Sequence, residues 1–135
     1  MYLLDTDTII YFFKNDAAVV ANFRLHDDSP KAISVITYAE LLYGAENSER
    51  RNENMARIHR FCELVPVIDV TRAVMETFSS TKLSLRKSGK PLDDFDLVIA
   101  STAITLGYSI VTNNVRHFSR IRGLKTENWK NEAIS

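Results

Sequence analysis

The chain has 135 residues, of which 45% are hydrophobic and 25% are charged, values that are typical of one globular domain. Lysine plus arginine equals aspartate plus glutamate at 17 each, so the net charge gives no sign of a polyanionic partner, and any contact with nucleic acid must be local. The only cysteine, Cys62, excludes an internal disulfide and a cysteine-based zinc site, and the three histidines lack the spacing of metal ligands.

The N-terminal half alternates short apolar runs with helix-like segments. Residues 2–4 are typical of a strand that ends at Asp5, and a helix is expected over residues 8–14 with Asp7 as its N-cap. The apolar run at 9–13 is too short to span a bilayer and no basic signal region precedes it, so we expect a soluble, cytoplasmic protein. The next predicted elements are a strand over 31–36, a helix over 37–47 that begins near Thr37, and a charged helix over 49–64.

The C-terminal half continues this alternation. Its predicted elements are a strand over 65–70, an amphipathic helix over 72–87, a loop over 88–92, a helix over 93–106 that ends at Gly107, a strand over 108–112, a short helix over 115–121 and a β segment over 124–127. No repeat or linker divides the chain, so we expect a single domain over 1–135 with a polar tail from about residue 128.

Strands that alternate with helices predict a fold of the α/β class. The expected architecture has three layers, α/β/α, around a central and mostly parallel sheet. Sheets of this kind place their functional sites at the carboxyl ends of the strands. Asp5 lies at one such end.

Three carboxylates stand in stretches that carry no other charge. Glu40 is the only charged residue in 32–45, and Asp96 is the only one in 95–115. Asp5 and Asp7 are the only two charges in 1–13. Glu40 shares a helix face with Gly44, whose lack of a side chain would let another backbone come close. Asp96 heads a helical stripe of apolar residues, so we expect these acids to be buried or half-buried.

A divalent cation is the natural partner of such acids. If Asp5, Glu40 and Asp96 converge, two carboxylates about 5 Å apart repel by roughly 3 kcal/mol at an effective dielectric near 20. Their segments offer no lysine, arginine or histidine nearby in sequence to neutralise them. Ligation by oxygen alone suits Mg²⁺ or Mn²⁺.

Each acid also has a simpler explanation. Asp5 alone could be a turn or capping residue, and Glu40 could pair with a remote arginine. Asp96 could complement the helix macrodipole, as we expect of Asp93 and Asp94. The three lone acids taken together are harder to explain in this way.

A different enzyme class also fits the first acids. The sequence Asp5-Thr6-Asp7-Thr8 carries the DxD part of the DxDx[TV] signature of haloacid-dehalogenase-type phosphatases, with Ile9 at the last position of the signature; in this alternative Asp5 would be the nucleophile and Asp7 the acid and base. Against this alternative, a helix-like segment follows at once, the chain is short, and no lysine motif lies between.

Four segments, taken in order, resemble the PIN-domain ribonucleases and, among them, the VapC toxins of bacterial toxin–antitoxin pairs. They are LLDTDTIIYFFK at 3–14, SVITYAELLYGAENS at 34–48, SGKPLDDFDLVIASTAITLG at 88–107 and IVTNNVRHFSRIRGLKTENW at 110–129. The resemblance implies a PIN-like fold and a catalytic set of Asp5, Glu40, Asp96 and Asn114, of which the three acids would hold the metal. Asn114 departs from the aspartate of many members, so a second metal ion would be held more weakly.

The same resemblance implies an activity and partners. The chain would be a Mg²⁺-dependent endoribonuclease, with Mn²⁺ able to substitute, that leaves a 3′-hydroxyl and a 5′-phosphate and inhibits translation and growth. Initiator tRNA is the first candidate substrate. The partners would be a second copy in a homodimer and a VapB-type antitoxin, through which alone the pair would bind operator DNA. A catalytically inactive PIN interaction module is the remaining alternative, and the presence of all three acids disfavours it.

Two basic stretches without acids are candidates for holding RNA. They contain Lys82, Arg86, Lys87 and Lys90 in the first and Arg116, Arg120, Arg122 and Lys125 in the second. The alternative is that these residues form an ordinary solvated surface. Thr6 and Thr112 stand beside the acids, where they either position water or phosphate or serve only the structure.

Overall fold

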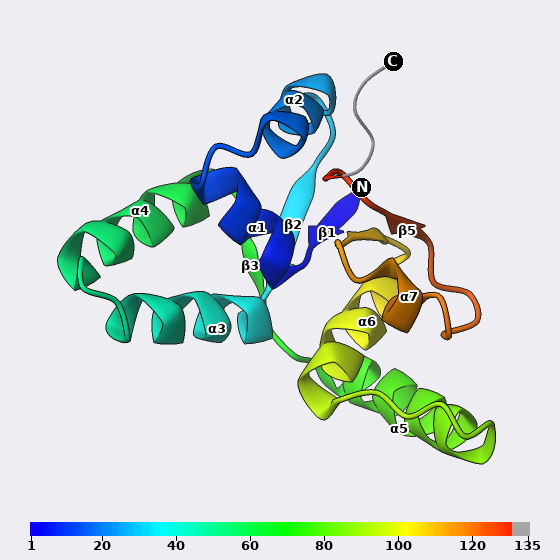
Figure 1. The fold of residues 1–135 in the computed structure, drawn as a ribbon. Coiled ribbons are helices and arrows are strands. Elements are labelled where there is room, and N and C mark those ends of the chain that lie inside the picture. Colours follow the sequence, from blue (N-terminus) through cyan, green and yellow to red (C-terminus); the bar gives the residue numbers. More distant parts are fainter. Residues whose placement is uncertain (131–135) are drawn as a thin grey trace.

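Five short strands form one parallel sheet in the computed structural model, which describes residues 1–130 (Figure 1). They are β1 (Tyr2–Leu4), β2 (Lys31–Ser34), β3 (Val67–Ile68), β4 (Ser109–Val111) and β5 (Thr126–Glu127). The strand order is β3-β2-β1-β4-β5, and every pair is parallel. The predicted α/β class with a central parallel sheet is therefore confirmed.

The helices connect these strands. They are α1 (Thr6–Phe13), α2 (Ala17–Leu25), α3 (Val35–Glu46), α4 (Arg51–Leu64), α5 (Arg72–Lys87), α6 (Asp94–Leu106) and α7 (Val115–Phe118). The amphipathic pattern predicted α5 from its first to its last residue. Gly107 ends α6 in the left-handed region, at φ 71°, as expected of a residue that lacks Cβ. Within residues 1–130, no helix is long and apolar enough to cross a membrane.

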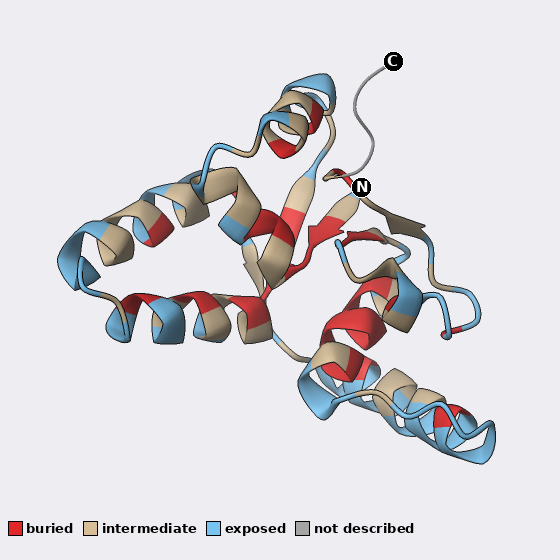
Figure 2. Cartoon of the chain, viewed as in Figure 1, coloured by how far each residue is buried: buried red, intermediate tan, exposed pale blue. Residues whose placement is uncertain are grey.

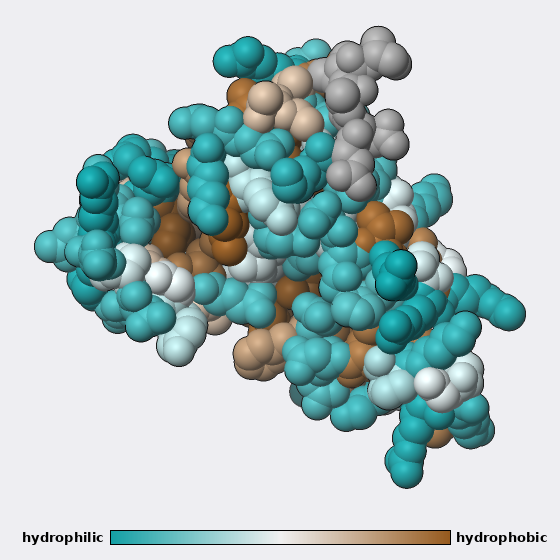
Figure 3. All heavy atoms as spheres, in the orientation of Figure 1, coloured by the Kyte–Doolittle hydropathy of each residue, from teal (hydrophilic) through white to brown (hydrophobic). Residues whose placement is uncertain are grey.

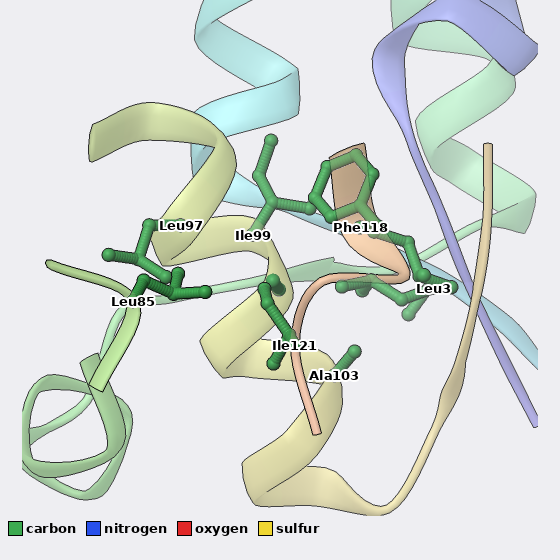
Figure 4. Close-up of a cluster of buried hydrophobic side chains, with 10 residues drawn as sticks. Leu3, Leu85, Leu97, Ile99, Ala103, Phe118 and Ile121 are labelled. Atoms are coloured by element: carbon green, nitrogen blue, oxygen red, sulfur yellow. The ribbon is translucent and has the colours of Figure 1, made fainter. Parts of the chain in front are cut away.

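Alternate residues of the strands pack into two separate hydrophobic cores, one on each face of the sheet. Leu3 and Ile110 pack with α5, α6 and α7 on one face of the sheet, as Figure 4 shows for Leu3. Leu4 and Val111 pack with α1, α3 and α4 on the other face. This alternation follows from the two-residue period of a strand, and it produces the expected three layers. The middle of α6 is buried all round, whereas α5 exposes most of its length (Figure 2).

Two helix starts and one glycine differ from the expectation. The side chain of Asp5, and not that of Asp7, caps α1, and α3 begins at Val35 with Ser34 as its cap, two residues before Thr37. Each helix therefore begins as soon as its strand ends. At Gly44, an added Cβ would meet no atom within 4 Å, so the expectation that another part of the backbone approaches there is wrong.

Helix α2 was not expected from the sequence. It is capped by Asp16, buries Val19 completely, and packs Phe23 against the core that contains Leu4 and Ile9. Trp129 lies in the segment assigned to a polar tail, yet it is only 2% exposed and its ring packs against those of Tyr2 and His26. The rest of that segment, residues 131–135, lies outside the described residues.

The topology defines where a site can form. The chain adds β2 and β3 to one side of β1, and then β4 and β5 to the other side. The crevice between β1 and β4 is therefore the switch point of the sheet, and ligands bind at the carboxyl ends of strands at such points. Asp5 directly follows β1, and Thr112 directly follows β4.

Candidate active site

Asp5 lies in the crevice between β1 and β4 and is only 6% exposed. Its backbone N–H donates to the carbonyl oxygen of Val111, at 2.9 Å, which continues the pairing of the two strands. Its carboxylate accepts two hydrogen bonds, from the Thr112 hydroxyl at 2.8 Å and from the Thr6 backbone N–H at 2.9 Å. Asp5 is thus both a helix cap and a buried acid aimed at the switch point.

The electrostatic setting of Asp5 is unfavourable to its charge. Burial raises the pKa of Asp5 from 3.8 to about 7, and the negative charges of Asp7 and Asp96 add to the rise. The hydrogen bonds from Thr112 and Thr6 oppose it without cancelling it. No lysine, arginine or histidine among residues 1–130 forms an ion pair with this carboxylate.

Glu40 enters the same region from α3. Its Oε1 accepts a hydrogen bond of 2.6 Å from the Thr6 hydroxyl, whose oxygen also lies 3.2 Å from that of Thr37. Within the described part of the chain, Glu40 forms no ion pair, so the alternative that it serves a remote arginine finds no support there. Thr6 therefore connects Glu40 to the residue next to Asp5.

Asp96 faces the site from the first turn of α6. Burial raises the pKa of Asp96, and the negative charges of Asp93 and Glu40 raise it further, whereas His117 lowers it. The charges of Glu40 on α3 and His117 on α7 thus both act on the Asp96 carboxylate. Asp93 is the N-cap of α6 and Asp94 pairs with Lys82 at 2.9 Å, so these two acids have the local roles expected of them.

Asn114 joins the site through its backbone. Its N–H donates to the Thr112 hydroxyl oxygen at 2.9 Å, and that hydroxyl in turn donates to Asp5. The Asn114 side-chain amide is within hydrogen-bonding distance of Nδ1 of His117. His117 was not among the site residues predicted from the sequence. His117 follows Asn114 by three residues, and Asn114 is the residue directly before the short helix. Residues at this spacing lie on the same side of a helix, and this was the signal that could have placed His117 in the site.

Asp7 lies beside the site, where it supports the loop after β4 rather than capping α1. Its carboxylate accepts hydrogen bonds from the Asn113 backbone N–H at 3.1 Å and from the Thr8 hydroxyl at 3.2 Å. Burial raises the pKa of Asp7. Asp7 therefore holds the loop after β4 against α1, next to the segment that carries Asn114.

The carboxylates of Asp5, Glu40 and Asp96 are the candidate ligands for a metal ion. Over residues 1–130, no three histidine, cysteine, aspartate or glutamate side chains lie close enough together to form a metal site as they stand. The chemistry nevertheless fits a divalent cation, because Asp5 is buried without a cationic partner and the neighbouring acids Glu40 and Asp96 repel one another. Such oxygen donors suit Mg²⁺ and Mn²⁺.

Parts of the two basic stretches converge beside the site. Lys90, Arg116 and Arg120 line a surface concavity of about 580 Å³, and Lys90, Arg120 and Arg122 line a second one of about 520 Å³. Arg120 donates to the Pro91 carbonyl oxygen at 3.4 Å, which joins α7 to the loop before α6. We call Lys90, Arg116, Arg120 and Arg122 the basic cluster. None of the four forms an ion pair within residues 1–130, whereas Lys82 is neutralised by Asp94.

Comparison with known proteins gives a consistent relationship. A family model described as the PIN domain matches residues 2–124. A tRNA(fMet)-specific endonuclease VapC from Shigella flexneri is 37% identical over 128 residues, which cover 95% of this chain and 97% of the relative. The Ribonuclease VapC2 of Haemophilus influenzae is 36% identical over the same length.

Solved structures agree. VapBC2 from Rickettsia felis, bound to a DNA fragment from the promoter, matches with a TM-score of 0.89 and 32% identity over 95% of this chain and 98% of the other. DNA-bound VapBC from Salmonella typhimurium matches with a TM-score of 0.88 and 35% identity, over 95% and 97%. This relationship rejects the haloacid-dehalogenase alternative for Asp5 and Asp7. The chain belongs to the PIN-domain family and, within it, to the VapC ribonucleases.

Proposed function

We propose that this protein is a Mg²⁺-dependent endoribonuclease and the toxin of a VapBC-type pair. The observation that carries the proposal is the buried Asp5 carboxylate at the switch point of the sheet, which forms no ion pair among residues 1–130 and interacts with the charge of Asp96, as Asp96 does with that of Glu40. Relatives over nearly the whole chain are named VapC ribonucleases, and two of them tRNA(fMet)-specific endonucleases. Initiator tRNA is therefore the first substrate to test, and its cleavage would inhibit translation and growth.

Asp5, Glu40 and Asp96 would hold the metal ion, with Mn²⁺ able to replace Mg²⁺. When bound, a divalent cation supplies positive charge to the phosphodiester and lowers the pKa of a water molecule. Thr112 and the Thr6 backbone orient the Asp5 carboxylate through two hydrogen bonds, so that its oxygens do not rotate freely.

The surrounding residues position the acids and the substrate. The Thr6 hydroxyl holds Glu40, which acts either as a ligand or as a general base through water. Asn114 and His117 border the site on the β4 side, where an amide and an imidazole can donate hydrogen bonds to phosphate oxygens. The basic cluster, whose Arg116 lies two residues after Asn114, would bind the RNA backbone.

Partners follow from the relatives. Structures of VapBC complexes bound to DNA match this chain over at least 95% of its length. We therefore expect a homodimer in the cytoplasm that pairs with a VapB-type antitoxin and reaches operator DNA only through that antitoxin.

The decisive experiment is cleavage of end-labelled initiator tRNA by the purified protein. Mg²⁺ or Mn²⁺ should support cleavage and a chelator should abolish it. Asp5→Asn, Glu40→Gln and Asp96→Asn should each reduce kcat by about a hundredfold or more, because each removes an acid from the charged centre of the site. Circular dichroism should show unchanged secondary structure in all three variants.

Asp94→Asn is the matched control. It makes the same chemical change two residues before Asp96, on the same helix, but at an exposed acid whose partner is Lys82. It should cleave tRNA at the wild-type rate. Near-full activity in the Asp96→Asn variant would contradict the proposed site. If the wild-type protein cleaves no RNA with any divalent ion, the remaining alternative, an inactive PIN interaction module, is correct.

A further inference from the structure

A small apolar pocket lies beside Glu40, on the side of the site away from α7. It has a volume of about 280 Å³ and is enclosed by α1, α3 and α4, with Phe13, Leu41 and Ile58 among its lining residues. Glu40 itself lines the pocket, which is therefore continuous with the candidate active site. In Figure 3, brown side chains are visible in a hollow on the left, between the helices that Figure 1 labels α3 and α4.

Gly44 leaves this pocket open. It lies inside α3 and lines the pocket, and its backbone does not have a positive φ. A glycine inside a helix costs about 1 kcal/mol relative to alanine, so its presence calls for a reason. The fold supplies none, because an added Cβ would meet no atom within 4 Å. The space above Gly44 is thus available to a group from outside this chain.

The polar groups at the pocket give the chemistry of that group. The guanidinium of Arg57 lies 5.7 Å from the centre of the Phe13 ring, and Lys14 lines the same pocket. Neither cation forms an ion pair within the described residues. The side-chain amide of Asn54 donates to the Ser48 hydroxyl. The side-chain oxygen of the same amide accepts no hydrogen bond from any described residue. Two cations that form no ion pair among the described residues and one side-chain acceptor thus surround an apolar floor.

We infer that this pocket takes one unstacked nucleobase of the RNA substrate, next to the phosphodiester that is cleaved. The inference rests on the proposed ribonuclease function. Proteins read single-stranded RNA by splaying bases onto aromatic rings and arginine planes, and here the guanidinium of Arg57, which lies over the Phe13 ring, offers such a plane. The pocket is smaller than the roughly 300–1,000 Å³ of sites for drug-sized ligands, so it suits a single flat ring. Lys14 and Arg57 match the charge of the flanking phosphates.

The protein side of the test fills the pocket. Gly44→Ala sets the baseline, and Gly44→Leu places a side chain in the open space without meeting another atom at Cβ. Gly44→Leu should reduce kcat/KM for tRNA cleavage by about tenfold or more relative to Gly44→Ala, which corresponds to the loss of one stacked base. Ala73→Leu is the matched control, since it makes the same alanine-to-leucine step at an exposed position of α5 and should leave kcat/KM unchanged.

The RNA side of the test uses the wild-type protein and needs no variant. The cleaved bond is first mapped, and an abasic nucleotide is then placed on either side of it. One of the two abasic substrates should be cut about tenfold more slowly by the wild-type protein. The same abasic substrate should cause no further loss in Gly44→Leu, because the pocket is already closed to the base.

Three outcomes would overturn the inference. Gly44→Leu could cleave like Gly44→Ala, the abasic substrates could both be cut at the normal rate, or the two losses could multiply, as for independent sites. A Gly44→Leu protein that cleaves RNA normally but binds the antitoxin less tightly would show that the pocket serves a protein. Failure of the proposed function itself looks different, since the wild-type protein would then cleave neither intact nor abasic RNA.

Discussion

The charged form of Asp5 is unfavourable at its buried position in this site. A buried carboxylate without a cation destabilises the fold when it is charged, and the hydrogen bonds from Thr112 and Thr6 offset only part of that cost. The same residue caps α1, so its backbone position is fixed by the start of the helix. A catalytic acid that is also a helix cap has little freedom to move away from its neighbours.

The raised pKa of Asp5 predicts a pH-dependent stability in metal-free buffer. The folded state holds a proton on Asp5 up to about pH 7, whereas the unfolded state releases it near pH 3.8. Stability should therefore fall as the pH rises from about 4 to about 7, by up to roughly 4 kcal/mol from this group. Urea unfolding at several pH values, with wild-type protein and with Asp5→Asn, measures it.

The Asp5→Asn protein should lose less stability than the wild type over that interval, because the amide does not titrate. A smaller decline should remain in this variant, since the pKa of Asp7 and that of Asp96 are also raised. Parallel pH profiles for the two proteins would contradict the assignment of Asp5 as the main titrating group.

Asn114→Asp tests the position where this chain departs from many PIN domains. A fourth carboxylate would add repulsion of roughly 3 kcal/mol per neighbour at about 5 Å, at an effective dielectric near 20. We expect tighter Mn²⁺ binding without RNA and lower stability without metal, and both effects must appear together. Calorimetry measures the Mn²⁺ affinity, and thermal unfolding in metal-free buffer measures the stability. Equal Mn²⁺ affinity and equal metal-free stability would place Asn114 outside the site.

Two of the three acids of the site lie on helices, Glu40 on α3 and Asp96 on α6. Helix α6 is buried from Leu97 to Ala103, so its first turn, with Asp96, is fixed by packing on several sides. Helix α3 begins directly at the end of β2 and presents Glu40 about one turn later. Positions on rigid helices hold the acids more firmly than positions on loops would.

Two glycines at the element scale should respond in opposite ways to the same substitution. Gly44→Ala should stabilise the protein by up to about 1 kcal/mol, because it restores helix propensity in α3 where there is room for Cβ. Gly107→Ala should destabilise it by about 1 kcal/mol, because Gly107 adopts φ 71° at the end of α6. Denaturant midpoints of both variants test the pair, and a shift of the same sign in both would contradict this account.

At the scale of the whole molecule, a net charge of zero conceals a local basic surface. The basic cluster draws Lys90 from one stretch of sequence and Arg116, Arg120 and Arg122 from another. Lys90 lies shortly before α6, whose first turn carries Asp96. Arg116 lies in α7, which begins directly after Asn114. The charge balance of the sequence is therefore no guide to what this face binds.

Charge reversal at Arg116 of the basic cluster, or at Lys87 of the first basic stretch, should change how RNA binding depends on salt. In the cleavage-deficient Asp96→Asn background, Arg116→Glu or Lys87→Glu should weaken tRNA binding and reduce the slope of log affinity against log salt by about 1 for each lost phosphate contact. Metal affinity should not change. Arg72→Glu, at the opposite end of α5 from Lys87, is the control. Unchanged slopes for both variants would show that these residues contact no phosphate and belong to the ordinary solvated surface.

Much of the architecture could be predicted from the sequence because it depends on local periodicity. The strand and helix patterns identified all the described elements except α2. Helix starts were displaced by a few residues, since a strand-end serine or aspartate captures the cap before a later candidate does. Uncharged surroundings likewise marked Asp5, Glu40 and Asp96, because isolated acids in apolar segments are costly wherever the chain folds.

Only the tertiary structure decided how these residues act on one another. The hydrogen bond from Thr112 to Asp5 spans 107 positions, and that from Thr6 to Glu40 spans 34, so no local pattern could predict either. The same holds for His117 beside Asp96, and for the open space at Gly44, where the sequence suggested a close backbone approach. Sequence periodicity records which face of an element is buried, whereas the order of strands in the sheet determines which elements meet.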